Sequence, residues 1–245
     1  MDADLNIPFE LNTLLHANHY SKWIYQSVEK HLGSRILELG AGIGNITQWL
    51  PKREILVVTE ADPALMDFTK NRIGRANPAI VYQHIDLDLS FSDQVKQYDV
   101  DTIVSFNVLE HIEDDAAAVR EQLRVLKQSK AQGKKRMVIF VPAHAFAYGS
   151  FDEIFKHYRR YSAKGLRQLF ASIDPALKVK TYYFNLLTLP GWLFAGRVVK
   201  STRFSPVQMK IVNAIIPFWA PFDWLIHHLF CIPLGQSVIA VVEVK

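Results

Sequence analysis

Two histidines in this chain have the residue type and the surroundings that acid–base chemistry requires. His111 comes shortly after an apolar run that ends at Asn107, and His157 lies in a segment rich in Arg and Tyr. A neutral imidazole, with an ordinary pKa of about 6.5, can remove a proton from a hydroxyl near neutral pH. We therefore predict His157 and His111 as candidate general bases, and we favour His157 because its segment is suited to holding a substrate.

The segment around His157 is dense in hydrogen-bond donors. It follows Pro142 and reads HAFAYGSFDEIFKHYRRYS. A guanidinium can hold a phosphate or carboxylate through two parallel hydrogen bonds. The alternative is a structural loop in which the arginines pair with nearby acidic residues. We predict that the segment binds the substrate through Tyr148, Tyr158, Arg159, Arg160 and Tyr161.

A glycine-rich stretch, RILELGAGIGNITQWL, provides a second kind of chemistry. The apolar run 36–39 is followed by Gly40, Gly42 and Gly44 and then by a helix-like apolar pattern, which predicts a strand, a tight turn and a helix. Such a turn lets backbone N–H groups approach a ligand closely. Glu60 ends the next apolar run, twenty residues beyond Gly40, where an acidic side chain can reach both hydroxyls of a ribose. The two signals predict a site for an adenosine compound.

Apolar runs and capping residues supply the elements that position these groups. Asp62 and Pro63 predict the start of a helix, and Ser162 predicts the cap of another at 163–171. A further helix is expected at 113–127. Beyond the first two strands, the apolar runs predict strands at 80–85, 100–107, 136–141, 178–184 and 237–245. The alternation of strands and helices indicates an α/β fold.

The E-L-G-A-G-I-G loop resembles motif I of the class I S-adenosylmethionine-dependent methyltransferases. Its G-x-G-x-G spacing differs from the G-x-G-x-x-G of dinucleotide-binding proteins. The sequence N-V-L-E-H-I at 107–112 resembles the L-E-H element of small-molecule methyltransferases, and Y-G-S-x-D followed by H-Y-R-R-Y-S resembles a bacterial subgroup of that family. The resemblance implies methyl transfer from S-adenosylmethionine.

The resemblance also implies a fold and a set of cofactor contacts. The fold is a Rossmann-like, seven-stranded, mostly parallel sheet with an antiparallel last strand and helices on both faces. N-terminal helices at 1–34 would cover the cleft, 35–185 would bind the cofactor, 186–236 would be a helical insert and 237–245 the last strand. Asp86, just past the third strand, is expected at the adenine. The expected cofactor-binding residues are Glu38, Gly40, Ala41, Gly42, Gly44, Glu60, Ala61, Asp86, Leu87 and Asn107.

The insert at 186–236 departs from a minimal family member. It combines large aromatic residues with Arg197, Lys200, Arg203 and Lys210, and its first acidic residue is Asp223. Pro217 and Pro221 are expected to break it into pieces shorter than a membrane span. The insert is therefore a lid over the substrate, a surface that lies on anionic lipid, or a dimer interface. We predict a small, hydrophobic or lipid-linked acceptor, with O-methylation favoured.

Composition limits the remaining classes. The 28 basic and 24 acidic residues give a net charge of +4, which is too balanced to predict a nucleic-acid partner. The single cysteine, Cys231, excludes an internal disulfide and a cysteine-rich zinc site, and we predict no metal. Without an N-terminal export signal, we expect a cytoplasmic protein, peripheral at the inner face of the membrane. The alternatives are a nucleic-acid or protein methyltransferase and a non-catalytic partner subunit, and the oligomeric state is not predicted.

Overall fold

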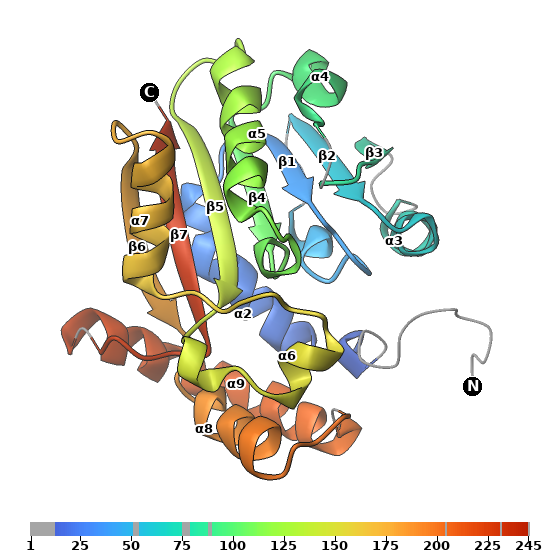
Figure 1. Ribbon diagram of the computed structural model, residues 1–245. Coiled ribbons are helices and arrows are strands. Elements are labelled where there is room, and N and C mark those ends of the chain that lie inside the picture. Colours follow the sequence, from blue (N-terminus) through green and yellow to red (C-terminus); the bar gives the residue numbers. More distant parts are fainter. Residues whose placement is uncertain are drawn as a thin grey trace.

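A computed structural model of the chain describes residues 13–50, 54–74, 79–87, 90–203, 205–230 and 232–244. The first twelve residues of the expected N-terminal region, and Cys231, lie outside these ranges. A seven-stranded sheet in the order β3-β2-β1-β4-β5-β7-β6 runs through the molecule (Figure 1). Its strands are β1 (Arg35–Leu39), β2 (Ile55–Glu60), β3 (Ile80–His84), β4 (Thr102–Phe106), β5 (Lys135–Pro142), β6 (Lys178–Phe184) and β7 (Ser237–Val244).

The strand directions confirm the predicted fold class. β7 pairs antiparallel with both β5 and β6, whereas β3, β2, β1, β4 and β5 pair parallel with their neighbours. β4 and β5 are almost wholly buried because helices cover both faces of the sheet, which explains their continuous apolar sequences. The carboxyl ends of the parallel strands consequently meet at one edge.

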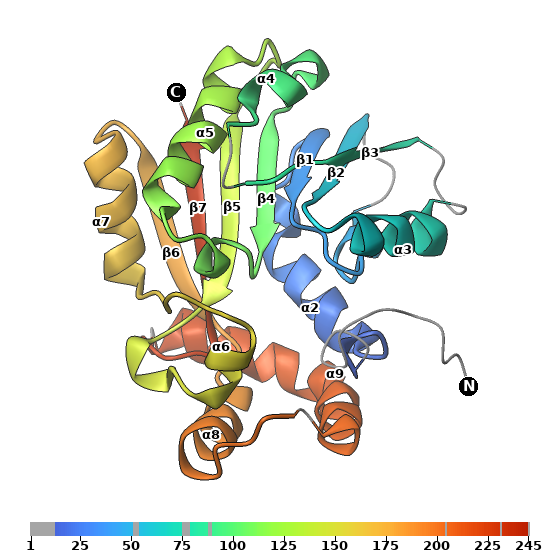
Figure 2. The ribbon, with the colours of Figure 1, turned by 45° about the vertical axis from the view of Figure 1, so that its right-hand side comes forward.

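Two hydrophobic clusters, one on each face, hold the helices to the sheet. On one face α5 (Asp115–Gln128) and α7 (Ala163–Ile173) bury apolar side chains against β1, β4, β5 and β7. On the other face α2 (Asn18–Val28) packs beside α9 (Pro206–Leu229), and Trp23 lies 4.2 Å from Phe184 between ring centroids. Figure 2 shows α5 and α7 on the side opposite α2. The helices packed on both faces hold the sheet, and with it the edge where the parallel strands end, in a defined position.

The predicted helix caps are confirmed. The Asp62 side chain accepts a hydrogen bond from the Ala64 N–H, and Pro63 occupies the first turn of α3 (Pro63–Ile73). The Ser162 hydroxyl accepts one from the Gly165 N–H at the start of α7. These caps satisfy N–H groups that have no partner within the helix.

The helix expected directly after the glycine turn is not formed. Residues 42–46 remain in turns, and only the short 3-10 helix η2 (Thr47–Trp49) follows. Gly44 has φ of +75°, which is outside the helical region, and Pro51 follows only seven residues later in the sequence. Too few residues remain for an α-helix. The glycine turn therefore presents its own backbone groups to a ligand, without a helix N-terminus behind it.

The insert contains α8 (Thr188–Leu193), the π-helix η6 (Phe194–Val198) and the long α9. The prediction that Pro217 and Pro221 break this region is wrong, because α9 runs through both. A proline at 217 leaves the Asn213 carbonyl without its helical donor. That carbonyl instead lies 3.0 Å from His19 Nδ1, which must carry the proton because a carbonyl only accepts. A partner on α2 thus compensates for the first proline.

Two polar residues fasten α9 to the rest of the fold. The Asn213 side-chain oxygen accepts the N–H groups of His19 and Tyr20, which caps α2 from a distant part of the chain. The buried Asp223 carboxylate accepts the N–H groups of Asn185 and Leu186, where β6 ends. Among the described helices, none is long and apolar enough to cross a membrane. α9 is thus a docked element of the fold, not a membrane span.

Candidate active site

The glycine turn lies at the carboxyl edge of the sheet and is held in place by β2 and α3. The Gly42 N–H donates to Glu60 Oε2 at 2.7 Å, and the Gly42 carbonyl accepts from Thr69 Oγ1 at 2.7 Å. Gly40, Gly42 and Gly44 all have positive φ. The turn and the acidic end of β2 therefore form one preorganised unit.

Two features of this turn fit an adenosine compound that carries an ammonium group. A Cβ added at Gly42 would meet no described atom within 4 Å, so the backbone there is open to a ligand. Beneath the turn, Glu38 is buried, and its Oε2 has no hydrogen-bond partner among the described residues. Burial and repulsion from Glu60 raise the pKa of Glu38 to about 8. A buried carboxylate in this position fits a cationic amino group, such as that of the methionine part of S-adenosylmethionine.

The raised pKa of Glu38 predicts how stability changes with pH in the absence of ligand. The folded pKa of about 8 lies above the unfolded value of 4.5, so the folded state holds the proton more strongly. The resulting contribution to stability is fully present below pH 4.5 and is lost as pH rises through 8. We expect Glu38→Gln, which mimics the protonated form, to raise Tm relative to the native protein increasingly between pH 5 and 8. Thermal melts of both proteins, with the exposed Glu113→Gln as control, measure this difference; a constant gap across that range would contradict it.

The other predicted cofactor-binding residues lie along the same edge. Asp86 is exposed two residues beyond β3, and β3 pairs with β2 so that His84 lies beside Glu60. Ala61 and Leu87 directly follow Glu60 and Asp86. Asn107 is exposed at the end of β4 with φ of +54°. Val108 lies against the glycine turn, since a Cβ on Gly40 would come within 2.7 Å of it. The edge thus brings the turn, Glu60 and the β4 end together, and their role as cofactor contacts stays a prediction.

Both candidate bases belong to one cluster beside the β4 end. The rings of His111 and His157 meet edge to face with centroids 4.7 Å apart. His157 Nδ1 lies 2.8 Å from Asp152 Oδ1, and its Nε2 lies 4.0 Å from Glu110 Oε1. An Nδ1–H donated to Asp152 leaves Nε2 of His157 as a lone-pair donor that faces Glu110 and His111. The cluster therefore brings two imidazole rings and two acidic side chains together at one point.

Burial shifts the pKa of two members of the cluster. Glu110 is fully buried, which raises its pKa to about 8 despite the nearby Arg160 guanidinium. His111 is exposed as a residue, but enclosure of its ring and the neighbouring His157 lower its pKa to about 4. His111 is consequently neutral at physiological pH.

Part of the segment predicted to bind substrate is buried and has a structural role. The Arg160 side chain is fully buried, donates from Nε to Asp152 Oδ1 at 2.7 Å, and lies over the Trp192 ring. The Tyr161 hydroxyl donates to Asp115 Oδ2 at 2.9 Å, and burial raises its pKa. These contacts match the salt-bridged alternative, and they correct the prediction for Arg160 and Tyr161, because their polar groups point into the protein.

The remaining members of the predicted substrate set lie nearer to the surface. Tyr158 is 54% exposed, and the Arg159 guanidinium lies 5.8 Å from the centroid of its ring and pairs with Asp115 at 2.9 Å. The Tyr148 hydroxyl donates to the His157 carbonyl. Tyr158 is therefore the member of this set that remains most available to an acceptor.

Sequence analysis missed Glu110 and Asp152 as site residues. Glu110 stood inside the L-E-H element, and its position next to His111 was the available signal. Asp152 lies in the short helix α6 (Ser150–Ile154), five residues before His157, so only the folded segment brings their side chains together. The two acids convert a pair of histidines into a four-residue cluster.

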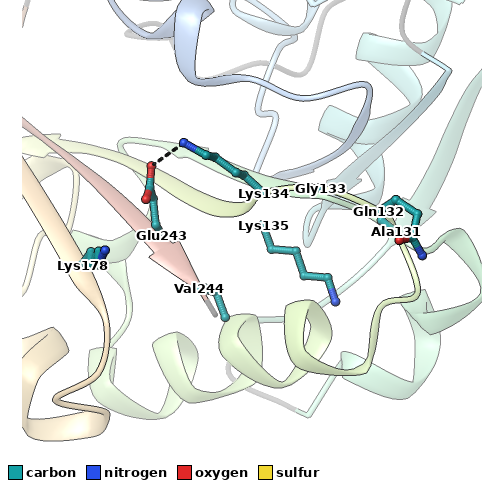
Figure 3. A pocket seen from close by; sticks show the side chains of 8 residues that line it. All are labelled: Ala131, Gln132, Gly133, Lys134, Lys135, Lys178, Glu243 and Val244. Carbon is teal, nitrogen blue, oxygen red and sulfur yellow. Dashed lines mark ion pairs between the residues drawn. The ribbon is translucent and has the colours of Figure 1, made fainter.

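A hollow of about 420 Å³ lies at the opposite end of the sheet (Figure 3). Lys134, Lys135 and Lys178 line it, and Lys134 pairs with Glu243. β5 and β6 begin here, whereas ligands of open α/β sheets bind where parallel strands end. The hollow is therefore separate from the site described above.

Comparison with known proteins agrees with the geometry. Residues 37–131 match the model of a methyltransferase domain, and no curated protein matches the chain in sequence. The YcgJ protein from Bacillus subtilis is 16% identical, with 93% of this chain and 98% of that chain covered and a TM-score of 0.56. An S-adenosylmethionine-dependent methyltransferase from Archaeoglobus fulgidus is 14% identical, with 97% and 98% covered and a TM-score of 0.55.

A corresponding enzyme from Mesorhizobium loti is 12% identical, with 91% of this chain and 98% of that chain covered and a TM-score of 0.54. At such identities the solved structures show the fold alone. The chain thus has the fold found in S-adenosylmethionine-dependent methyltransferases, and residues 37–131 match the model of a methyltransferase domain.

Proposed function

We propose that this enzyme methylates a hydroxyl group on a small hydrophobic or lipid-linked acceptor, and that it works at the surface of an anionic membrane. The observation that carries the proposal is an apolar stripe along the outer face of α9. We call it the outer stripe, and its members are 39 to 76% exposed: Val207, Ile211, Ile215, Phe218, Phe222, Leu225 and Leu229.

The outer stripe has helical spacing and lies opposite the docked face of α9. Its members recur every three or four residues, whereas Ile216 and Asp223 between them are only 2% exposed. Proteins seldom leave so long an apolar surface uncovered without a partner for it. Exposed Arg197, Lys200 and Lys210 belong to the same insert, whose one acidic residue in the sequence, Asp223, is buried. An apolar surface with surrounding cations suits anionic lipid.

The stripe and the proposed chemistry meet at the same end of the molecule. Figures 1 and 2 both place α6 (Ser150–Ile154), α8 and α9 together at the end where β5 terminates. Ser150 donates to the Gly196 and Ser201 carbonyls, which ties the His157 segment to the insert. An acceptor held in lipid would thereby reach the carboxyl edge of the sheet without crossing water.

Some residues at this edge would bind the cofactor, and others would bind and deprotonate the acceptor. The bound cofactor supplies a methyl group already activated by the positive sulfonium sulfur. Glu60, Glu38 and the glycine turn would hold it, with Asp86 at the adenine. His111 and His157 would face the acceptor, and a ring nitrogen of one of them would receive the hydroxyl proton. Alignment of the two reactants can supply on the order of 7 to 11 kcal/mol of the barrier. The likeness to the bacterial subgroup with H-Y-R-R-Y-S stays a prediction.

An acceptor screen tests the proposal directly. The protein is incubated with methyl-labelled cofactor and with three extracts: membrane lipids and quinones, lipid-linked sugars, and polar metabolites. We expect label to enter an organic-soluble product that mild base does not release, as an ether would behave. Label recovered mainly in polar metabolites, in RNA or in protein would overturn the acceptor class.

We expect Glu60→Ala to weaken cofactor binding at least tenfold. The substitution removes the carboxylate that would hold the ribose and that accepts the Gly42 N–H, and a charge-assisted hydrogen bond contributes about 1.5–3 kcal/mol. Calorimetry with S-adenosylmethionine and with its demethylated product measures the change. Glu54→Ala is the matched control, because Glu54 is an exposed acid just before the opposite end of β2. Equal affinities in all three proteins would refute the assignment of Glu60.

A further inference from the structure

Glu110 is the least satisfied charged group among the described residues of this edge. Its side chain is 0% exposed, and neither of its carboxylate oxygens has a hydrogen-bond partner within the described part of the chain. The neighbouring acids are already paired, Asp152 with Arg160 and Asp115 with Arg159. A buried carboxylate normally requires a cation or a set of donors. Both carboxyl oxygens of Glu110 are therefore available to bind a cation.

The donors around Glu110 have the composition of a transition-metal site. One donor atom each from Glu110, His111 and His157 lies within 4.8 Å of the other two, and the His157 to Glu110 distance is 4.0 Å. Tetrahedral coordination at 2.0–2.2 Å requires donors about 3.4 Å apart. Contraction by up to about 1.4 Å therefore closes the site. Two imidazoles with one carboxylate favour Zn²⁺ over Mg²⁺ or Ca²⁺, which prefer oxygen.

The residues behind the donors orient them as metal ligands are oriented. Asp152 Oδ1 lies 2.8 Å from His157 Nδ1, which fixes the tautomer whose Nε2 faces Glu110. Asp152 is itself held by the Gly149 N–H and by Arg160. A carboxylate behind a histidine in this way is typical of metal sites, where it sets ring orientation and basicity. Three protein ligands leave the fourth position of a tetrahedral ion for a further ligand.

We propose that Glu110, His111 and His157 bind a divalent transition-metal ion, with Zn²⁺ the best match, and that Asp152 positions His157 for it. This site revises the prediction that the chain binds no metal.

The role of the ion rests on the proposed function. An acceptor hydroxyl on an open coordination position would ionise more readily, because the cation stabilises the alkoxide. In the transfer, the O–H bond breaks and its proton passes to water, since both imidazole lone pairs are then used by the ion. The oxygen forms a bond to the methyl carbon, the S–CH₃ bond breaks, and its electron pair stays on sulfur.

Metal binding is tested without cofactor or acceptor. The chelator-treated protein is titrated with Co²⁺, followed by its visible absorption, and with Zn²⁺ in a chelator-competition assay. We expect one ion per chain, and at least hundredfold weaker binding in His111→Ala and in Glu110→Gln. Glu113→Gln and His16→Ala remove the same chemical groups from exposed positions and should bind as the native protein does. His111 is exposed, so its variant should fold, and Zn²⁺ should raise Tm of the native protein and not of this variant.

The outcomes separate the metal site from methyl transfer. No saturable binding, or equal affinity in the His111→Ala and native proteins, overturns the metal site. Calorimetry with S-adenosylmethionine on the same samples tests the cofactor independently. If the protein still binds the cofactor and turns over after the metal is removed with a chelator, the proposed methyl transfer stands, with an imidazole as the base and no role for the ion. Zn²⁺ binding without transfer to any hydrophobic acceptor would leave the metal site and refute the proposed acceptor.

Discussion

Replacing Arg160 with alanine is expected to lower the free energy of unfolding by about 3–5 kcal/mol, as breaking a buried ion pair does. The Arg160 and Asp152 side chains are both 0% exposed and 2.7 Å apart, so the substitution leaves a buried carboxylate without its guanidinium. Arg160 also donates to the Ala143 carbonyl and lies over the Trp192 ring, and both contacts are lost. Urea denaturation measures the change.

The adjacent arginine provides the control. Arg159 is one-third exposed and pairs with Asp115, so Arg159→Ala should cost less than about 1 kcal/mol. The comparison separates the two interpretations of the segment, because a substrate-binding arginine would change acceptor KM and leave stability unaltered. A stable Arg160→Ala protein with a raised KM would restore the original substrate-binding prediction.

Replacing both Phe218 and Phe222 with glutamate is expected to weaken binding of the protein to anionic vesicles about a hundredfold. These residues are 76% and 59% exposed in the centre of the outer stripe. Burying a phenylalanine contributes about 1.5–3 kcal/mol, and every 1.4 kcal/mol is a factor of ten in affinity. Sedimentation with vesicles containing phosphatidylserine measures the partition coefficient. Binding by the native protein should also weaken with salt, because the cations of the insert are screened.

A matched double variant controls for added charge. Gln168→Glu with Ser172→Glu places two carboxylates four residues apart on the exposed face of α7, and its vesicle binding should fall far less than that of the α9 variant. If the native protein stays in the supernatant at low salt, the membrane proposal is wrong. A native mass that rises with concentration, and that the α9 variant lowers, would identify the stripe as a dimer interface instead.

The sheet could be predicted because its signals are local. Continuous apolar runs such as that of β4 require burial on both faces, and the caps at Asp62 and Ser162 depend on residues two to three positions away. The glycine turn and Glu60 could be paired because a strand–turn–strand unit fixes their separation. Each of these inferences uses fewer than about thirty residues of chain, which is the size of one βαβ unit.

Several errors in the prediction arise from contacts that the sequence does not show. α9 tolerates Pro217 because His19, on another helix, supplies the donor that the proline lacks. Arg160 was predicted to bind the substrate because it lies in a polar segment, and a sequence does not show which side chains of such a segment turn inward. Glu110 was overlooked as a site residue because its burial depends on β4, the His157 segment and Arg160 together. Charged side chains take their role from these long-range contacts.

The cap that Asn213 places on α2 also has a consequence for how parts of this enzyme separate. His19 and Asn213 are 194 positions apart, yet the first turn of one helix depends on a side chain of the other. Opening α9 would expose those N–H groups to solvent, so the two helices should exchange their amide hydrogens as one cooperative unit. A shortened chain without α9 would therefore also destabilise α2. Loss of turnover in that chain would not show which role the insert itself has. Point substitutions on the outer stripe leave this unit intact.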